Sequence, residues 1–285
     1  MIIVMNAAGQ LCNRLVLLAH AYATGLESGQ RVVHLVAHDL QKDIRLEGPS
    51  LHVTGYDARG LYLNGYEKVM AKLYGPGFRT RHRDRAEAQR ARLSKKGLHL
   101  LDNWYYRDYE ALFAHRRQIA EAFSPVEEHA RRVAAFADGM RERYPGHAFV
   151  GVHIRRGDYR TWRGGAYYYD NVQFCRWMRE LQDSTDRRLA FVLFSNEPVS
   201  AEDFADSGCT VLCGPGQPIE DLYVMAQCDY IFGPPSSYSW WAAFYGERKY
   251  LTMYSPTQSI AEQDFAPVAG EEFNPDSAEK RMKKG

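Results

Sequence analysis

A short apolar strand that ends in two adjacent arginines is the feature that most limits how this chain can fold. Branched apolar residues recur at every second position from Val150 to Ile154, which predicts a buried strand. Arg155 and Arg156 follow it directly, and Asp158 comes two residues later. Ligands of open α/β sheets bind beyond the carboxyl ends of the strands, where paired guanidinium groups suit a pyrophosphate. The alternative is an exposed salt-bridge cluster, which we disfavour because the charges follow a buried strand.

Predicted strands alternate with predicted helices along most of the chain. Strands are expected over residues 2–5, 31–36, 98–101, 149–154, 189–194, 209–212, 230–233 and 249–253. Helices are expected over residues 13–27, 124–144 and 171–181, and again from residues 218 and 236. This alternation predicts an α/β protein with a parallel doubly wound sheet in its C-terminal half. The expected domains are 1–145 and 146–255, followed by a tail over 256–285 that either folds back or stays loose.

Composition and charge exclude several classes of protein. A chain of 285 residues with 45% hydrophobic residues suits one large or two ordinary globular domains. The net charge of +1 gives no global reason to expect nucleic acid as a partner. The five cysteines are odd in number and scattered, so zinc is not expected and a reduced, cytoplasmic protein is the simplest account. No apolar run approaches the ~20 residues of a membrane span, although the basic end leaves a peripheral membrane contact open.

One segment is strongly basic. The stretch from Arg79 to Lys96 holds six arginines and two lysines against Asp84 and Glu87, a balance of 8 − 2 = +6. Such a run is usually a solvated helix face or loop, and no aromatic residues interleave these charges. The sharper alternative is a landing surface for an acidic glycan or a lipid-linked phosphate.

The residues from His153 to Tyr159 resemble the H-x-R-R-x-D motif of the α1,2-, α1,6- and protein O-fucosyltransferase superfamily, and are most similar to its α1,2 branch. With further matching stretches, the resemblance runs from residue 6 to about residue 250. It implies two Rossmann-like domains facing a cleft, the GT-B arrangement, with the acceptor on the first domain and the GDP-sugar on the second. The implied reaction transfers fucose from GDP-fucose to a sugar hydroxyl with inversion, most simply α1,2 to galactose in a bacterial surface glycan.

The first of these stretches is the loop after the first strand. Gly9, Leu11, Asn13 and Arg14 match the family's G-G-L-G-N-Q/R element, and Cys12 departs from it. In the family this loop helps to place the acceptor and the transferred sugar, which would put Asn13 and Arg14 near the chemistry. The alternative is that Asn13 caps the following helix and Arg14 is solvated. A later aromatic segment, residues 104–106, also has a family counterpart and either flanks an acceptor sugar or packs in the core.

Two further stretches resemble the family's nucleotide site. Asn196 and Glu197 stand where the family's F-S-D-D strand end has two aspartates, so Glu197 keeps one charge. Asp221 lies in a segment similar to D-L-x-L-M-S-x-C, whose aspartate in relatives binds the N1 and N2 edge of guanine. A carboxylate can accept both of those hydrogen bonds, which would select GDP over ADP. The alternative is that Asp221 only favours a helix start.

The last stretch resembles the N-S-S-F-S-W-W signature, with Pro235 in place of the asparagine. Free amides at a helix start and the hydroxyls of Ser236 and Ser237 form an anion cradle, which would hold the β-phosphate opposite Arg155. The tryptophans at 240 and 241 are expected to pack the helix onto the sheet. The chain has no Asp-x-Asp pair, so neither a metal nor a further cofactor is expected and arginine must neutralise the leaving group.

The resemblance assigns roles to the residues around the arginines. Arg155 is expected to be the principal donor to the leaving diphosphate, with Arg156 assisting it or anchoring the loop. His153 is expected to contact the nucleotide, and Asp158 either orients the arginines or acts as general base; we favour orientation. The competing functions are transfer of another GDP-sugar or to another position, and non-catalytic binding of a GDP-sugar or glycan.

Overall fold

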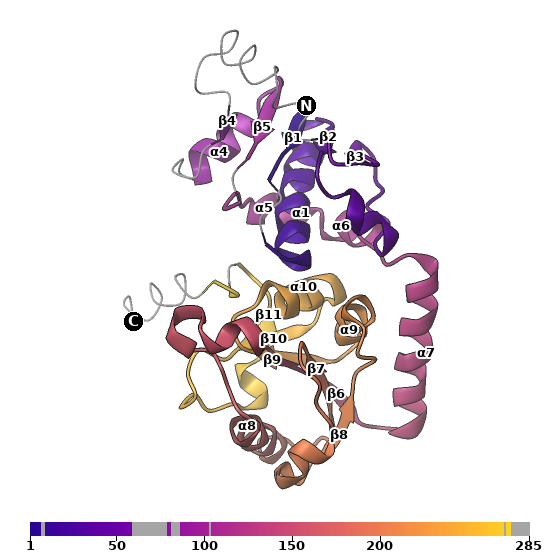
Figure 1. The fold of residues 1–285 in the computed structure, drawn as a ribbon, viewed down its shortest axis with the longest axis vertical. Helices are drawn as coiled ribbons and strands as arrows, with labels where there is room; N and C mark the ends of the chain where they lie inside the picture. Colours follow the sequence, from indigo (N-terminus) through magenta and orange to yellow (C-terminus); the bar gives the residue numbers. More distant parts are fainter. Residues whose placement is uncertain (7–8, 59–78, 81–85, 103, 271, 275–285) are drawn as a thin grey trace. The chain divides into compact units, whose positions relative to one another are not determined.

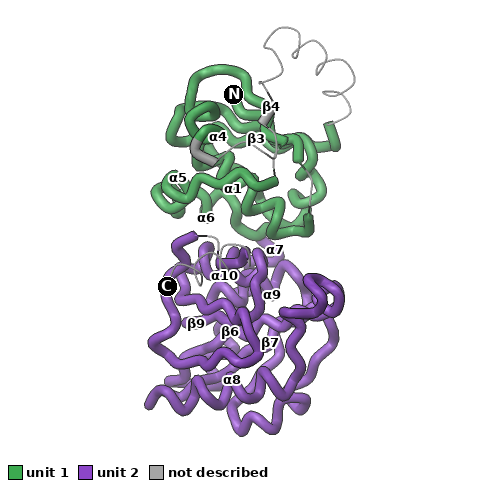
Figure 2. The backbone as a smooth tube through the Cα atoms, turned by 90° about the vertical axis from the view of Figure 1, so that its left-hand side faces the viewer, with its two compact units in different colours: residues 1–126 green, residues 127–285 purple. Residues whose placement is uncertain are grey.

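The computed structural model describes residues 1–6, 9–58, 79–80, 86–102, 104–270 and 272–274. The chain forms two compact units, residues 1–126 and residues 127–285 (Figure 2). The helix α7, Glu127–Arg143, therefore belongs to the second unit, whereas the sequence pattern predicts a boundary after that helix.

The physical reason for this assignment is the way α7 packs against α9, Pro218–Met225. Glu220 of α9 is buried, and its Oε1 accepts a hydrogen bond from Arg132 of α7 at 3.0 Å. The Nδ1 atom of His129 lies 3.1 Å from the same oxygen. A buried carboxylate is costly to leave unpaired, so these contacts tie α7 to the second unit.

The first unit is built around a parallel sheet in the order β3-β2-β1-β5-β4. Its strands are β1 (Ile2–Val4), β2 (Val32–His34), β3 (Leu51–Val53), β4 (Arg79–Thr80) and β5 (His99–Leu101). Its helices are α1 (Leu11–Ser28), α4 (Ala86–Leu93), α5 (Tyr109–Ala114) and α6 (Arg116–Ala122), with a short 3-10 helix η1 (His38–Lys42). The strands on one side of β1 follow in the order β2, β3, and those on its other side are β5 and β4. The strand order therefore reverses between β1 and β5, and the carboxyl ends of these two strands form a topological switch point.

Helix α1 is buried nearly all round because it lies in the centre of this unit. Residues 15–25 are all buried, and the helix packs on β1, β2, α5 and α6. Gly29 ends the helix with a φ of +61°, a left-handed conformation that glycine adopts at little cost. The sequence pattern predicts an end near residue 27, and the helix ends at Ser28. The alternative role of Asn13, as the cap of this helix, is wrong, because the helix begins at Leu11 and Asn13 lies within its first turn.

The second unit holds a larger sheet in the order β11-β10-β9-β6-β7-β8. Its strands are β6 (Ala148–Ile154), β7 (Leu189–Ser195), β8 (Thr210–Cys213), β9 (Tyr230–Gly233), β10 (Lys249–Thr252) and β11 (Ala266–Pro267). The helices besides α7 and α9 are α8 (Asn171–Asp183) and α10 (Ser237–Gly246), with 3-10 helices η2 (Gly157–Arg160), η3 (Trp162–Gly165), η4 (Glu202–Ser207) and η5 (Glu262–Asp264). All neighbouring strands are parallel except the edge strand β11, which pairs antiparallel with β10.

This sheet is doubly wound, as the sequence predicts. One face of β6 packs with the aromatic side chains of α8, notably Phe174 and Trp177. In Figure 1, α8 and α9 lie on opposite sides of the sheet. On the α9 side, a Cβ at Gly151 would lie 3.1 Å from Met225 Cγ and 3.5 Å from Cys228 Sγ. The strand order places the switch point between β6 and β9, so the loop after β6 and the start of α10 meet at the edge where such sheets bind ligands.

The tail folds back on this unit as far as the structure describes it. Glu262 accepts a hydrogen bond from Tyr230 at the start of β9, and β11 extends the sheet. Further on, Phe273 is buried against Trp240 of α10. Residues 275–285 lie outside the described part, as do residues 81–85 of the basic stretch, whose proposed landing role stays a prediction.

Candidate functional site

The loop after β6 holds Arg155 against the carboxylate of Asp158. Arg155 Nη2 lies 2.9 Å from Asp158 Oδ1, and the guanidinium lies over the ring of Tyr159, 5.7 Å from its centroid. The Arg155 side chain is 18% exposed and that of Asp158 is 56% exposed. A guanidinium paired with a largely solvated carboxylate can exchange that partner for another anion, because exposed ion pairs are weak.

Arg156 has a different environment, although it too lies in the loop after β6, which ends at Ile154. Its Nη2 donates to the side-chain oxygen of Asn171, the first residue of α8. Its Nε is buried without a hydrogen-bond partner among the described residues. Within the second unit the two arginines therefore face different neighbours, Arg155 within the loop and Arg156 toward α8. This geometry agrees with the anchoring role expected of Arg156.

Asn196 and Glu197 at the end of β7 brace the backbone of the arginine loop. Asn196 Oδ1 accepts from the Arg156 amide at 2.7 Å, and Glu197 Oε1 accepts from the Gly157 amide at 3.0 Å. Glu197 also accepts two hydrogen bonds from Arg160, at 2.9 and 3.3 Å. Gly157 has a φ of +57°, and a Cβ there would lie 2.9 Å from Asn196 Nδ2. The family resemblance predicts that this pair lies in the nucleotide site but gives no sign of the bracing contacts, which depend on the pairing of β6 with β7.

His153 is buried next to the start of α10. Its Nδ1 lies 3.1 Å from the hydroxyl of Ser239, and its ring centroid lies 5.2 Å from that of Tyr238. Burial, together with the nearby Arg155 charge, lowers the pKa of His153 to about 3. The imidazole is therefore neutral at physiological pH and offers a hydrogen bond rather than a positive charge.

The start of α10 lies at the carboxyl end of β9, as the signature predicts. Ser236 caps the helix, and its hydroxyl accepts from the Tyr238 amide at 3.2 Å. The hydroxyl of Tyr159, in the arginine loop, donates to the carbonyl of Pro235. Burial raises the pKa of Tyr159 above its ordinary value, so the phenol stays protonated and keeps this hydrogen bond. The arginine loop and the amides of Ser236 and Ser237 are thus joined into one polar edge.

Trp240 and Trp241 both have no exposed surface, which confirms that they pack α10 into the core. The Trp240 ring is stacked on Phe244, one turn later in the same helix, with 5.5 Å between centroids. The aromatic string therefore fixes the position of the helix, and its polar start supplies the groups that face the edge of the sheet.

Asp221 is buried in the first turn of α9. Its Oδ1 accepts from the Gly216 amide at 2.8 Å, in the loop between β8 and α9. Burial raises the pKa of Asp221 from its ordinary 3.8 to about 6, and the Glu220 charge acts in the same direction. A carboxylate held at that pKa is mostly ionised at pH 7 and can accept two hydrogen bonds from a ligand.

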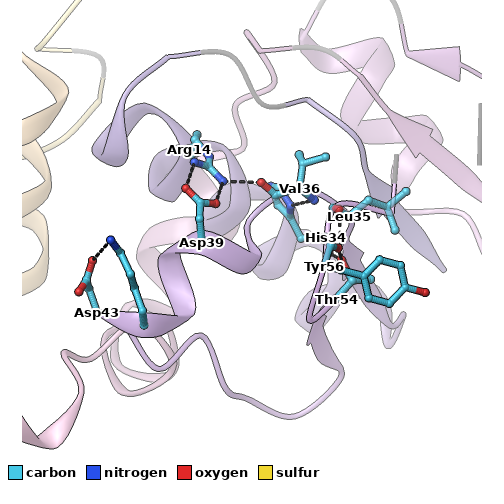
Figure 3. A network of polar contacts seen from close by, with 9 residues as sticks. Arg14, His34, Leu35, Val36, Asp39, Asp43, Thr54 and Tyr56 are labelled. Atoms are coloured by element: carbon cyan, nitrogen blue, oxygen red, sulfur yellow. Dashed lines mark hydrogen bonds and ion pairs between the residues drawn. The ribbon is translucent and has the colours of Figure 1, made fainter. Parts of the chain in front are cut away.

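In the first unit, Arg14 is held by a carboxylate that the sequence analysis did not single out (Figure 3). Arg14 donates to both oxygens of Asp39, at 2.9 and 2.6 Å, and to the carbonyl of Val36. Its side chain is 13% exposed, so the alternative of a solvated Arg14 is wrong. The neighbouring His34 is fully buried, and burial lowers its pKa to about 3, with the Arg14 charge as a smaller cause.

Gly9 and Asn13 form the tight entry to α1. Gly9 has a φ of +86°, and a Cβ there would lie 2.5 Å from the side-chain nitrogen of Asn13. Only glycine allows this approach, which accounts for the glycine of the matched element.

The aromatic segment after β5 divides into two parts. Tyr106 is fully buried and hydrogen-bonded to Thr24, whereas Tyr105 is 51% exposed.

In the described part of the chain, no three His, Cys, Asp or Glu side chains gather closely enough to hold a metal ion. None of the helices in that part is long and apolar enough to span a membrane.

Comparison with known proteins places this geometry in a family. The sequence profile of glycosyl transferase family 11 matches residues 67–269. Galactoside alpha-(1,2)-fucosyltransferase 2 of Gorilla gorilla gorilla is 29% identical over 172 residues, 54% of this chain and 48% of that protein. Galactoside alpha-(1,2)-fucosyltransferase 1 of Lagothrix lagotricha is 30% identical over 155 residues, 49% of this chain and 39% of that protein. The match thus spans half or less of the length of these relatives.

Solved structures share the fold. NodZ alpha-1,6-fucosyltransferase soaked with GDP-fucose superposes with a TM-score of 0.54 at 16% identity, covering 86% of this chain and 92% of that one. A mutant of Arabidopsis thaliana FUT1 in complex with GDP superposes with a TM-score of 0.56 at 12% identity, covering 93% of this chain and 73% of that one. At such identities the likeness shows the GT-B type fold.

Proposed function

The chain belongs to glycosyl transferase family 11, and from that premise we propose that it transfers fucose from GDP-fucose to a hydroxyl group of a glycan. The observation that carries the proposal is the polar edge of the second unit, where Arg155 and the start of α10 meet beyond the switch point between β6 and β9. Cationic and amide donors at this edge suit a nucleoside diphosphate.

The finer proposal is inverting transfer with α1,2 linkage to a terminal galactose of a bacterial surface glycan. Two matched relatives are named galactoside alpha-(1,2)-fucosyltransferases, which supports this linkage and acceptor. The sequence departs from the family pattern at Asn196 and Pro235. Because of these two differences, transfer of another GDP-sugar is the alternative function.

In the proposed reaction, an acceptor hydroxyl oxygen forms a bond to the anomeric carbon of fucose. The bond from that carbon to the β-phosphate oxygen breaks, the electron pair leaves with GDP, and the proton of the acceptor hydroxyl is released to solvent. Negative charge therefore grows on the diphosphate, and fixed donors aimed at it are the largest source of catalysis in such sites. We assign that role to Arg155, with the amides at Ser236 and Ser237 as further donors.

The groups around Arg155 have supporting roles in this proposal. Asp158 orients the guanidinium in the free protein and is displaced toward solvent when the diphosphate binds. Arg156 and Glu197 hold the loop, one through Asn171 and the other through the Gly157 amide. His153 is neutral and so contributes a hydrogen bond to the bound donor without repelling the positive charge that develops on the sugar.

Asp221 selects the base in this proposal. A carboxylate accepts from the N1 and N2 donors of guanine, and adenine offers no such pair. The Gly216 amide occupies one carboxylate oxygen from within the fold, which fixes the direction of the other.

The first unit supplies the acceptor side in this proposal. Asn13 in the first turn of α1 and the exposed Tyr105 both lie beyond carboxyl ends of the strands β1 and β5. An exposed tyrosine suits the apolar face of a sugar ring. Arg14 supports this region through Asp39 and Val36 and does not itself bind the donor.

We propose that no metal ion takes part, because Arg155 and the helix start already provide positive charge for the leaving group. The first test is a thermal-shift series with GDP, UDP, ADP and CDP, followed by GDP-fucose against GDP-mannose. We expect GDP and GDP-fucose to raise the unfolding temperature most. Release of GDP that depends on a galactoside then separates a transferase from a protein that only binds the nucleotide sugar, and a preference for UDP would overturn the proposal.

A further inference from the structure

A short segment near the C-terminus is fastened to helix α10 by one carboxylate. We call Ala269, Gly270, Glu272 and Phe273 the C-terminal latch. Glu272 Oε2 accepts from the indole Nε1 of Trp240 at 2.9 Å and from the Gly270 amide at 3.1 Å. Its Oε1 accepts from the Ala269 amide at 2.9 Å. The carboxylate is thus held by its own segment and directed at the helix.

Apolar contact reinforces this attachment. Phe273 is buried, and its ring lies edge-on to Trp240 with 5.2 Å between centroids. Trp240 is fully buried, so its indole N–H has no access to solvent and depends on a protein acceptor. Because the Trp240 amide also donates to the Ser236 carbonyl at 3.2 Å, the latch holds the first turn of α10.

A second connection runs from the latch to His153 through buried hydroxyls. The carbonyl of Glu272 accepts from Thr252 Oγ1 at 3.1 Å, and Thr252 is hydrogen-bonded in turn to Tyr250. The Tyr250 hydroxyl lies 3.3 Å from Ser239 Oγ, which lies 3.1 Å from His153 Nδ1. Thr252, Tyr250 and Ser239 are all buried, so water cannot easily replace any member of this chain.

We infer that the C-terminal latch is a positioning element for the donor site, with Glu272 as its key residue. It acts through Trp240 on the start of α10 and through the buried hydroxyls on His153. The inference rests on the proposed function, because it assigns the start of α10 to the diphosphate. Glu272 and Phe273 lie beyond residue 269, where the family match ends, so the family profile does not include them.

The physical argument is preorganisation. Helix amides stabilise an anion only when they are already aimed at it, because movement on binding costs part of the interaction. Removing the Glu272 carboxylate leaves a buried indole N–H and two loop amides without their acceptor, so this end of α10 must shift or admit water. The result is weaker binding of the diphosphate, and the latch itself need not touch it.

The tail provides a matched control. Glu262 is a second tail glutamate whose carboxylate is also held by the fold, but it accepts from Tyr230 at the opposite, amino end of β9. Glu272→Ala and Glu262→Ala should both lower the unfolding temperature. Only Glu272→Ala should raise the KM for GDP-fucose, by about tenfold, since of the two changes it alone removes the acceptor of the buried Trp240 indole in α10. Glu272→Gln keeps an oxygen for the Trp240 indole and should recover most of that loss.

Hydrogen exchange tests the latch without relying on activity. We expect the amides of residues 237–241 to exchange faster in Glu272→Ala than in Glu262→Ala at equal distance below each unfolding temperature. Equal exchange in the two variants, or an equal rise in KM, would overturn the inference. If the unaltered protein binds neither GDP nor GDP-fucose, the proposed function fails, and the exchange comparison still decides whether Glu272 holds α10.

Discussion

Both units place an arginine near the carboxyl ends of parallel strands at a topological switch point, but the two arginines have different surroundings. Arg14 lies inside helix α1, and Asp39 holds it through both carboxylate oxygens while the Val36 carbonyl holds it from within the fold. Arg155 lies in the loop after β6, and one nitrogen of its guanidinium meets one oxygen of Asp158.

This difference indicates which of the two guanidinium groups can exchange its carboxylate partner for a phosphate. A two-point contact with a carboxylate fills the planar fork, so a phosphate would have to break both hydrogen bonds of Arg14 at once. For Arg155, the ion pair with the largely solvated carboxylate of Asp158 can be exchanged at small cost. The same position on the sheet therefore holds an arginine fixed within the fold in the first unit, and in the second unit the arginine to which we assign binding of the diphosphate.

The largest expected effect is that of Arg155→Ala. Removing the principal donor to the leaving diphosphate should lower kcat by about 10²–10³-fold, with little change in unfolding temperature because Asp158 remains solvated. Steady-state rates of GDP release measure the first quantity and thermal unfolding the second. Arg155→Lys keeps the charge and loses the fork, so it should recover only part of the rate. Full activity in Arg155→Ala would end the assignment.

The second effect in size concerns Asp221. Asp221→Ala should weaken GDP binding about 10- to 100-fold and ADP binding little, because hydrogen bonds to a charged group are lost only for guanine. Titration calorimetry with both nucleotides measures the difference. Equal losses for GDP and ADP would show that Asp221 only supports the start of α9.

The pH dependence of GDP binding provides an independent check on Asp221. Its pKa is raised to about 6, and the ionised form is the one that accepts both guanine donors. GDP affinity should therefore be full above pH 6 and fall as the pH drops through that value. The contribution of Asp221 to the stability of the free protein has the opposite pH dependence. Folding holds the Asp221 proton more tightly than the unfolded chain does, so this group favours the folded state below pH 4 and that contribution is lost as the pH rises through about 6.

The sequence predicts the second unit better than the first because its signals are local. The strand before Arg155 and the cap at Ser236 depend on neighbours a few residues away, and both lie where the pattern predicts them. The divergence of Arg155 and Arg156 carries no such signal, because both lie in the loop beyond Ile154, and the sequence pattern treats them as one pair of guanidinium groups. The pairing of Arg14 with Asp39 joins residues 25 positions apart and also carries no local signal.

Long-range contacts limited the prediction of the site as well. Asn196 and Glu197 brace the arginine loop because β6 and β7 are neighbours, which a motif comparison does not reveal. The tail shows the same limit, since the Glu272 contact with Trp240 spans 32 residues and follows no motif. Burial and hydrogen bonding across elements decide these positions, whereas periodicity and capping decide the elements themselves.

A smaller effect is expected for Arg14→Ala, which sharpens the contrast with Arg155. The change should cost about 1–3 kcal/mol of stability, because the Val36 carbonyl loses its charged donor and Asp39 its partner. The KM for GDP-fucose should change less than about threefold, since the donor does not contact Arg14 in this proposal. Denaturant unfolding of Arg14→Ala, Asp39→Ala and the double variant measures the coupling. A large loss of activity in Arg14→Ala with unchanged stability would remove the contrast between the two arginines.

The smallest expected effect is that of a chelator, for which we expect no change. If Arg155 and the start of α10 neutralise the leaving diphosphate, EDTA should leave both kcat and KM as they are. The measurement requires protein purified without divalent ions and assayed with EDTA, then with added Mg²⁺ or Mn²⁺. The same assay on Arg155→Ala is a sharper test. Added Mg²⁺ or Mn²⁺ should raise the rate of that variant alone, because a cation can replace its missing positive charge. A fall in rate with EDTA in the unaltered protein would mean that a metal shares the role assigned to Arg155, and the contrast with Arg14 would then no longer explain where the diphosphate binds.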